Sequence, residues 1–100
     1  CCVSAHACLG DHSVLNLNVT YGHDTRSGSH LIVNPGAAIS GQVTLGHRVL
    51  IGANSFILQG VTIGDDCQID AMTYVGRDID PANLVTSRQM KTYPRMDLKK

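Results

Sequence analysis

The stretch that decides the fold is residues 45–70, which read LGHRVL, IGANSF, ILQGVT, IGDDCQ and ID when they are divided into groups of six. An aliphatic residue opens each group, at Leu45, Ile51, Ile57, Ile63 and Ile69. A period of six fits neither an α-helix, with about 3.6 residues per turn, nor a free strand, with a period of about two. It is typical of a short strand and a turn that recur, as in a hexapeptide β-helix.

The same frame runs through most of the chain without an insertion. Before Leu45 it meets Ile39, Val33, Ser27, Tyr21, Leu15, Leu9 and Val3, and after Ile69 it meets Val75 and Pro81. A second small or apolar residue follows four positions later in most groups: Ala7, Ser13, Val19, Thr25, Leu31, Ala37, Val43, Val49, Ser55, Val61 and Cys67. We therefore expect an all-β fold, a parallel β-helix of about four coils with two side chains per group facing a narrow interior. Three groups make one coil, so residues 18 positions apart are expected to stack.

Glycines and Pro81 indicate where the chain turns and where the array ends. Gly46, Gly52 and Gly64 each follow an aliphatic residue, where we expect glycine to relieve strain at a sharp turn or to take a positive φ. The period is lost after Pro81, so residues 1–81 are expected to form the β-helix domain. Residues 82–100 turn basic and are expected to form a C-terminal tail or a short cap, because a β-helix end has to be covered against edge pairing.

Composition argues against several classes of function. The 100 residues hold 8 Lys and Arg against 8 Asp and Glu, and no basic patch interleaved with aromatic residues indicates a nucleic-acid partner. No apolar run approaches the ~20 residues of a membrane span, and no signal peptide is evident, so we expect no membrane association and a cytoplasmic location. The four cysteines lack CxxC spacing and are expected to be reduced.

Candidate catalytic residues lie in the least regular coil, residues 21–38. His23 stands two positions after Tyr21 in its group, between Gly22 and Asp24, so its side chain is expected at a corner or facing outward. A carboxylate beside a histidine stabilises the imidazolium that forms when the ring takes a proton, so the pair can act as a general base. By itself the dipeptide is a weak signal, and a solvated surface histidine is the alternative.

Residues 16–46 resemble the hexapeptide acyltransferases of bacterial amino-sugar and sialic-acid pathways, the NeuD/PglD-type sugar acetyltransferases. The resemblance covers nearly the whole chain and is most specific at residues 22–24 and 35–46. It implies a left-handed β-helix in which His23 is the general base and Asp24, with Asn16 seven residues before the histidine, orients the imidazole. It also implies that the N–H of Gly41, 18 residues after His23, binds the oxyanion of the thioester carbonyl.

The resemblance implies direct acetyl transfer from acetyl-CoA to an amine or hydroxyl of a sugar-like acceptor, such as an amino-sugar nucleotide, without a covalent enzyme intermediate or a metal. Ala53 and Ala71 match positions whose backbone amides meet the pantetheine and the adenine-side phosphates. Gln59 and Arg77 continue the column of residues 23 and 41 at 18-residue spacing. Arg77 could reach a phosphate, and a solvated arginine is the alternative. Family members are trimers with pantetheine in the groove between β-helices, so a homotrimer is expected, which gives a thin solenoid more buried area.

Departures from the family keep other functions open. The N-terminal Rossmann-like domain that helps hold the nucleotide-sugar is missing, Ile32 stands where many members have a second histidine, and residues 81–83 replace the usual terminal motif. A non-catalytic trimeric scaffold or relic is the main alternative. A zinc enzyme is another, but no two histidines have the five-residue spacing of the carbonic anhydrases with this fold. His12 and His30 are expected to stack, followed by Arg48 in the next coil.

Overall fold

The structure is a computed structural model that describes residues 1–87 and 92–94. Within these residues it contains thirteen strands of two residues each and no helix. The strands are β1 (Cys2–Val3), β2 (Val14–Leu15), β3 (Thr20–Tyr21), β4 (Arg26–Ser27), β5 (Ile32–Val33), β6 (Ala38–Ile39), β7 (Thr44–Leu45), β8 (Leu50–Ile51), β9 (Phe56–Ile57), β10 (Thr62–Ile63), β11 (Gln68–Ile69), β12 (Tyr74–Val75) and β13 (Leu84–Val85). The expectation of an all-β fold is confirmed.

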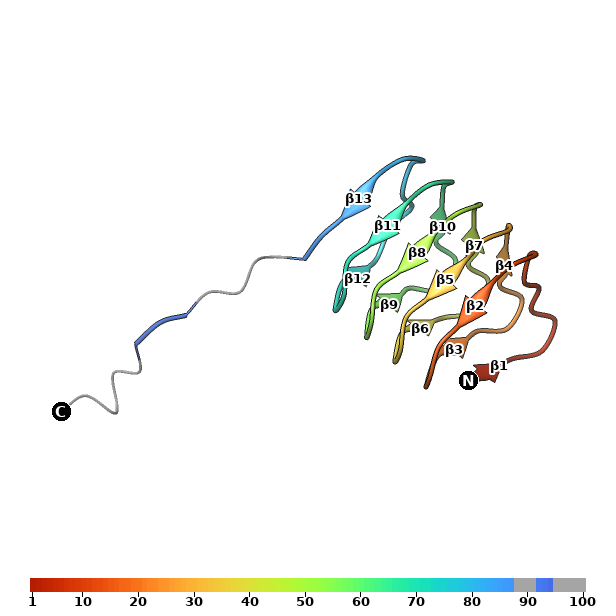
Figure 1. The fold of residues 1–100 in the computed structure, drawn as a ribbon, viewed down its shortest axis with the longest axis horizontal. Helices are drawn as coiled ribbons and strands as arrows, with labels where there is room; N and C mark the ends of the chain where they lie inside the picture. The colour runs from red at the N-terminus through yellow and green to blue at the C-terminus, as the bar shows by residue number, and fades with distance from the viewer. Residues whose placement is uncertain (88–91, 95–100) are drawn as a thin grey trace.

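The strands wind into a solenoid with three parallel sheets as its faces (Figure 1). The first face holds β1, β3, β6, β9 and β12, the second face β4, β7 and β10, and the third face β2, β5, β8, β11 and β13. Tyr21 pairs with Ile39, and Ile39 pairs with Ile57, so the register advances by 18 residues at each coil as expected. The described residues contain no helix that is long and apolar enough to span a membrane.

Each face is joined to the next by a corner. The first corner follows the first face and holds residues 22–25, 40–43, 58–61 and 76–78. The second corner follows the second face and holds residues 28–31, 46–49 and 64–67, and the third corner follows the third face and holds residues 16–19, 34–37, 52–55 and 70–73. Residues of one corner therefore form columns that run along the axis of the β-helix.

The last coil is shorter than the repeat predicts. Ile79, rather than Pro81, pairs with Ile63, and Val85 pairs with Ile69, so this register advances by 16 residues. Pro81 therefore does not end the array, and the β-helix has about five coils instead of about four. The strand β13 lies inside the segment expected to be a tail or cap, and residues 88–91 and 95–100 of that segment lie outside the described residues.

The core consists of the two interior positions of each group, as the pattern predicts. Its buried apolar side chains are Val19, Tyr21, Leu31, Val33, Ala37, Ile39, Val43, Leu45, Val49, Ile51, Ile57, Val61, Ile63, Cys67, Ile69 and Val75. Ser27, the polar exception to the frame, accepts a hydrogen bond from the N–H of Gly10 at 3.2 Å. The Tyr21 hydroxyl donates to the carbonyl oxygen of Cys8 at 2.6 Å, so a large side chain on the neighbouring strand lies where Ser27 is small.

The expectation that the glycines after the aliphatic residues take a positive φ is wrong. The left-handed residue stands two positions later, at His6, His12, Asn18, Asp24, His30, Gly36, Gln42, Arg48, Asn54, Gly60, Asp66 and Met72. Glycine is needed after the aliphatic residue for space: a Cβ on Gly22 would lie 2.6 Å from the amide nitrogen of Gly41, and one on Gly64 would lie 2.6 Å from that of Pro81. The coils therefore approach each other most closely at these glycines.

Candidate active site at the first corner

His23 and Asp24 lie at the first corner, between β3 and β4. The Nδ1 atom of His23 is 3.1 Å from the Oδ2 atom of Asp24, and the two side chains are 54% and 50% exposed. Asp24 has a φ of 57°, and its N–H donates to the carbonyl oxygen of Ala5 at 3.1 Å. The left-handed corner thus places the carboxylate beside one ring nitrogen and leaves Nε2 for another partner.

Gly41 lies one coil further along the same corner, beneath the imidazole of His23. A Cβ on Gly41 would lie 2.6 Å from the Cε1 atom and 2.8 Å from the Cδ2 atom of His23, so only glycine leaves room for the ring in this position. The main chain joins the two coils here, because the N–H of Gln42 donates to the carbonyl oxygen of His23 at 2.8 Å. Among the described residues the N–H of Gly41 has no hydrogen-bond acceptor.

The column of His23 and Gly41 continues through Gln59 and Arg77. Both of these side chains are exposed, and the amide of Gln59 donates to that of Gln42 at 3.4 Å. Arg77 stands in the shortened corner that leads to Ile79. Among the described residues Arg77 has no carboxylate within ion-pair distance, so its guanidinium is available to an anion from outside the chain.

The remaining predicted site residues lie at the third corner. The side-chain amide of Asn16 donates to the carbonyl oxygen of Val33 at 3.1 Å and to the amide oxygen of Asn34 at 3.4 Å. Ala53 and Ala71 follow on later coils of the same corner. One chain therefore brings His23, Asp24 and Gly41 together but places Asn16, Ala53 and Ala71 across the first face from them.

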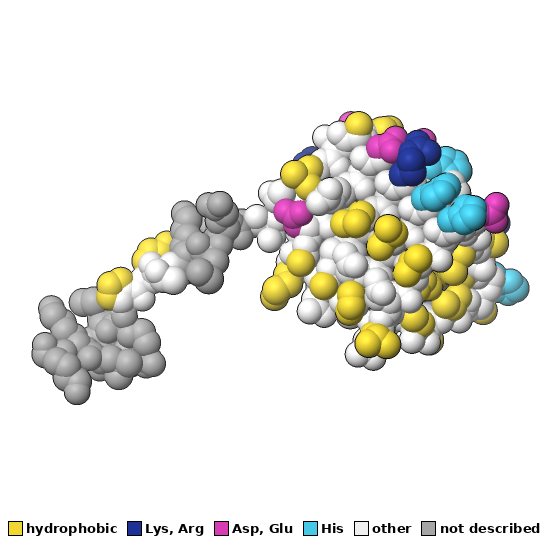
Figure 2. Space-filling view, viewed as in Figure 1, with side chains coloured by type: hydrophobic (Ala, Val, Ile, Leu, Met, Phe, Trp, Pro, Cys, Tyr) yellow, Lys and Arg dark blue, Asp and Glu magenta, His cyan; other side chains and the backbone are white. Residues whose placement is uncertain are grey.

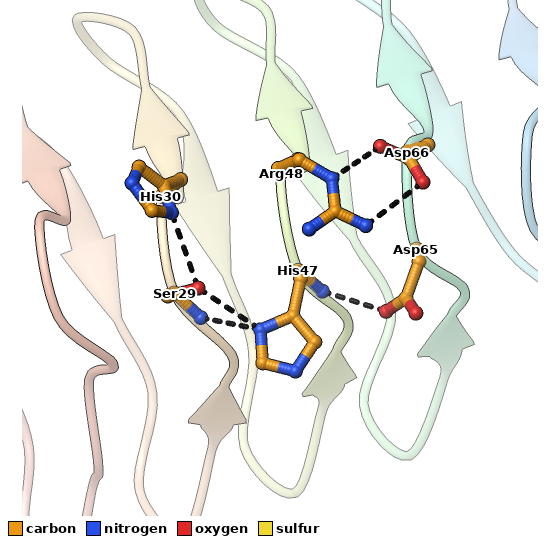
Figure 3. Close-up of polar contacts among 6 residues, drawn as sticks. All are labelled: Ser29, His30, His47, Arg48, Asp65 and Asp66. Atoms are coloured by element: carbon orange, nitrogen blue, oxygen red, sulfur yellow. Dashed lines mark hydrogen bonds and ion pairs between the residues drawn. The ribbon is translucent and has the colours of Figure 1, made fainter.

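A polar ladder occupies the second corner (Figures 2 and 3). The rings of His12 and His30 stack with their centroids 5.1 Å apart, as the 18-residue spacing predicts. Arg48 forms a two-pronged ion pair with Asp66 through contacts of 2.6 Å and 3.1 Å. This pair lowers the pKa of the Asp66 carboxyl, chiefly through the hydrogen bond from Arg48.

Sequence reasoning missed the contacts of His47 in this ladder. The Nδ1 atom of His47 accepts a hydrogen bond from the N–H of Ser29 at 2.8 Å, and the N–H of His47 donates to Asp65 at 2.7 Å. Ser29 and Asp65 each stand 18 positions from His47 in the sequence, which was the available signal. Within the part of the chain that the structure describes, no three His, Cys, Asp or Glu side chains gather so as to hold a metal ion.

Comparison with protein sequences places the repeats in a known group. Residues 42–77 match the family model described as the hexapeptide repeat of succinyl-transferase. Over 73 residues the chain is 34% identical to the acyl-[acyl-carrier-protein]–UDP-N-acetylglucosamine O-acyltransferases of Burkholderia mallei and Helicobacter pylori. These matches cover 73% of this chain but 28% and 27% of those proteins, so the chain spans less than a third of their length.

Solved structures give a more extensive match. A variant of perosamine N-acetyltransferase from Caulobacter crescentus, in complex with CoA and GDP-perosamine, aligns with a TM-score of 0.83 and 29% identity over 85% of this chain and 40% of its own. The acetyltransferase domain of PglB from Neisseria gonorrhoeae, in complex with acetyl coenzyme A, aligns with a TM-score of 0.71 and 27% identity over 85% and 44%. The resemblance expected from the sequence is thus confirmed: this β-helix is similar to hexapeptide-repeat acyltransferases.

Proposed function

We propose that this chain carries the acyl-transfer site of a CoA-dependent acetyltransferase that acts on a sugar-like amine or hydroxyl. The observation that carries the proposal is the first corner, where the imidazole of His23 lies between the Asp24 carboxylate and Gly41. A base with a free ring nitrogen and an unpaired N–H one coil away are the two groups that attack on a thioester requires. The similarity to acetyltransferases solved with CoA or acetyl coenzyme A supports the choice of donor.

The proposed reaction is a direct transfer. The acceptor nitrogen or oxygen attacks the thioester carbon while His23 Nε2 takes its proton, and the Asp24 carboxylate at Nδ1 stabilises the imidazolium. The carbonyl oxygen of the thioester becomes an oxyanion that accepts a hydrogen bond from the N–H of Gly41. When the tetrahedral intermediate collapses, the carbon–sulfur bond breaks, the acetyl group stays on the acceptor, and His23 returns the proton to the thiolate of CoA.

The complete site is proposed to form between copies of the chain in a homotrimer. His23, Gly41, Gln59 and Arg77 occupy the first corner, whereas Asn16, Ala53 and Ala71 occupy the third. A second copy can bring a third corner next to a first corner and so complete the set. The row of outward-facing apolar residues on the third face (Val14, Ile32, Leu50 and Leu84) gives the association an apolar contribution (Figure 2).

Two other candidates have specific support. The curated relatives are acyltransferases whose printed donor is an acyl carrier protein, so a protein-bound acyl group is the alternative donor. The placement of Asn16 away from His23 in one chain favours a non-catalytic scaffold if no second copy completes the site.

Thermal melting in the presence of acetyl-CoA, followed by turnover assays with amino-sugar nucleotides, tests the proposal. Acetyl-CoA at 100 times its dissociation constant should stabilise the folded state by ~2.7 kcal/mol per site, and release of free CoA thiol should depend on the acceptor. A trimer that is neither stabilised by acetyl-CoA nor active would support the scaffold. Activity with an acyl carrier protein but not with acetyl-CoA would support the alternative donor.

A further inference from the structure

Two aromatic side chains form an exposed platform on the first face. Phe56 on β9 and Tyr74 on β12 are direct partners in the parallel sheet and point outward. Their ring planes differ by 5°, their centroids lie 5.8 Å apart, and the side chains are 40% and 62% exposed. Neither ring contributes to the interior of the β-helix, and a flat, parallel, solvent-facing pair of this kind can hold a further planar ring.

The Tyr74 ring lies against the backbone at the start of the first corner. A Cβ on Gly76 would come within 2.7 Å of Cε2, 3.2 Å of Cζ and 3.3 Å of the hydroxyl oxygen of Tyr74. The missing side chain at residue 76 therefore lets the ring lie flat beside Arg77, the next residue. The platform and a cation free of ion pairs within the described chain thus lie together at one end of the column that begins at His23.

The distance along this column suits the donor. His23 and Arg77 are separated by three coils, and neighbouring strands lie about 4.8 Å apart, so the column spans roughly 14 Å. An extended pantetheine arm covers a distance of this order between its thiol and its phosphates. A donor whose thioester lies at His23 and Gly41 would therefore present its phosphates near Arg77 and its base near Tyr74.

We propose that Phe56 and Tyr74 are a stacking platform for the adenine base of the acyl donor, with Arg77 beside it to pair with the phosphates. The inference rests on the proposed function and narrows it to one donor. CoA carries an adenine, whereas the phosphopantetheine of an acyl carrier protein does not. The platform therefore assigns the site to CoA rather than to a carrier protein.

The experiment compares two donors that differ only in the adenosine part, acetyl-CoA and acetyl-4′-phosphopantetheine, by calorimetric titration of the full chain. Stacking of a base on an aromatic side chain contributes about 1–3 kcal/mol. The Tyr74→Leu variant should therefore bind acetyl-CoA ~5- to ~150-fold more weakly and bind acetyl-4′-phosphopantetheine as the unchanged chain does. Tyr74→Phe, which keeps the ring, should keep the affinity for acetyl-CoA.

A matched control is Leu84→Ala, which removes a side chain that is equally exposed at 61% but lies on the third face. It should change neither affinity. A second variant, Gly76→Ala, keeps both aromatic side chains but displaces the Tyr74 ring, and it should also weaken acetyl-CoA. Thermal melting of each variant shows that the β-helix is intact.

Each of the other outcomes overturns the inference in a distinguishable way. If the unchanged chain binds acetyl-CoA and Tyr74→Leu binds it equally well, the platform does not hold adenine, and the proposed function stands. If the unchanged chain binds neither donor, the proposed function fails and the inference with it. If Tyr74→Leu lowers the mass of the assembly by light scattering, the rings are a contact between copies and not a site for the base.

Discussion

At the scale of single residues, His23 offers the most direct separation of chemistry from stability. Its side chain is half exposed and contacts the chain mainly through Asp24, so His23→Ala should change the free energy of unfolding by less than ~0.5 kcal/mol. Loss of a general base should lower turnover by about 10²- to 10⁴-fold. Steady-state assays and urea unfolding on the same preparation provide the measurement, and a large loss of stability would show that the residue is structural.

Gly41 and Gly22 form a matched pair at the same corner. A Cβ on Gly41 would meet the exposed ring of His23, which can move, whereas a Cβ on Gly22 would meet the main chain at Ser40 and Gly41. Gly41→Ala should therefore lower turnover at least tenfold, because it displaces the base, while melting changes little. Gly22→Ala should instead lower the melting temperature, because backbone cannot move aside cheaply. Equal melting temperatures for the two variants would contradict this account.

Tyr21 has a role in the core that depends on pH. Burial raises the pKa of its hydroxyl above the ordinary value of 10.0. The stability contributed by the neutral phenol is therefore fully present below pH 10 and is lost as the pH rises through the raised pKa. Tyr21→Phe should cost ~1 kcal/mol at pH 7 by removing the hydrogen bond to Cys8. Urea titrations at pH 7 and above pH 10 should show the difference between the two proteins narrowing and then reversing in alkali.

At the scale of an element, each corner contains one residue in the left-handed conformation. Along the third corner this position is filled by Asn18, Gly36, Asn54 and Met72 in successive coils. Asparagine and glycine tolerate a positive φ, whereas a residue such as methionine is expected to be strained there by roughly 1–2 kcal/mol. Met72 is the exception in its column, with a φ of 60° and 75% exposure.

Replacement of Met72 should therefore stabilise the fourth coil. Met72→Asn is expected to raise the free energy of unfolding by about 1 kcal/mol, since the relief of strain is not offset by a lost core contact. Met72→Ala keeps a Cβ without the side-chain amide and should give less than half of that gain. Denaturant midpoints measure both, and an equal gain from alanine would mean that the methionine side chain, not the backbone, is the source of the effect.

At the scale of the whole molecule, the division of the site between two corners predicts an obligate assembly. Light scattering should give about three times the mass of one chain, and the melting temperature should rise with protein concentration, because association stabilises only the folded state. Acetyl-CoA should shift the equilibrium toward the trimer if its site is shared between copies. A monomer that binds acetyl-CoA with full affinity would contradict the shared site.

The extent to which sequence predicts this molecule follows from its periodicity. The six-residue frame predicts the buried positions and the stacking of His12 on His30, because one backbone unit recurs. It does not predict the shortened corner before Ile79, because two missing residues leave the apolar alternation readable in either register. Positive φ values were misplaced because the positions that adopt them carry His, Asp, Gln or Arg as often as glycine.

The candidate site was less predictable than the fold. The pairing of His23 with Asp24 and the proximity of Gly41 followed from adjacency and 18-residue spacing. The separation of Asn16 from His23 did not, because seven residues along the chain cross from one corner to the next. The platform of Phe56 and Tyr74 depends on side-chain orientation over Gly76, which no spacing reveals.

The register of 18 residues has one more consequence, for chain length. Any insertion of one whole coil keeps every interior side chain facing inward, whereas an insertion of any other size rotates the remaining sequence out of phase. Duplicating residues 43–60 would thus move Arg77 one coil, or about 4.8 Å, further from His23 without altering either neighbourhood. The β-helix is in this sense a spacer that can be lengthened only in fixed steps, and evolution or an engineer can adjust its reach by counting coils.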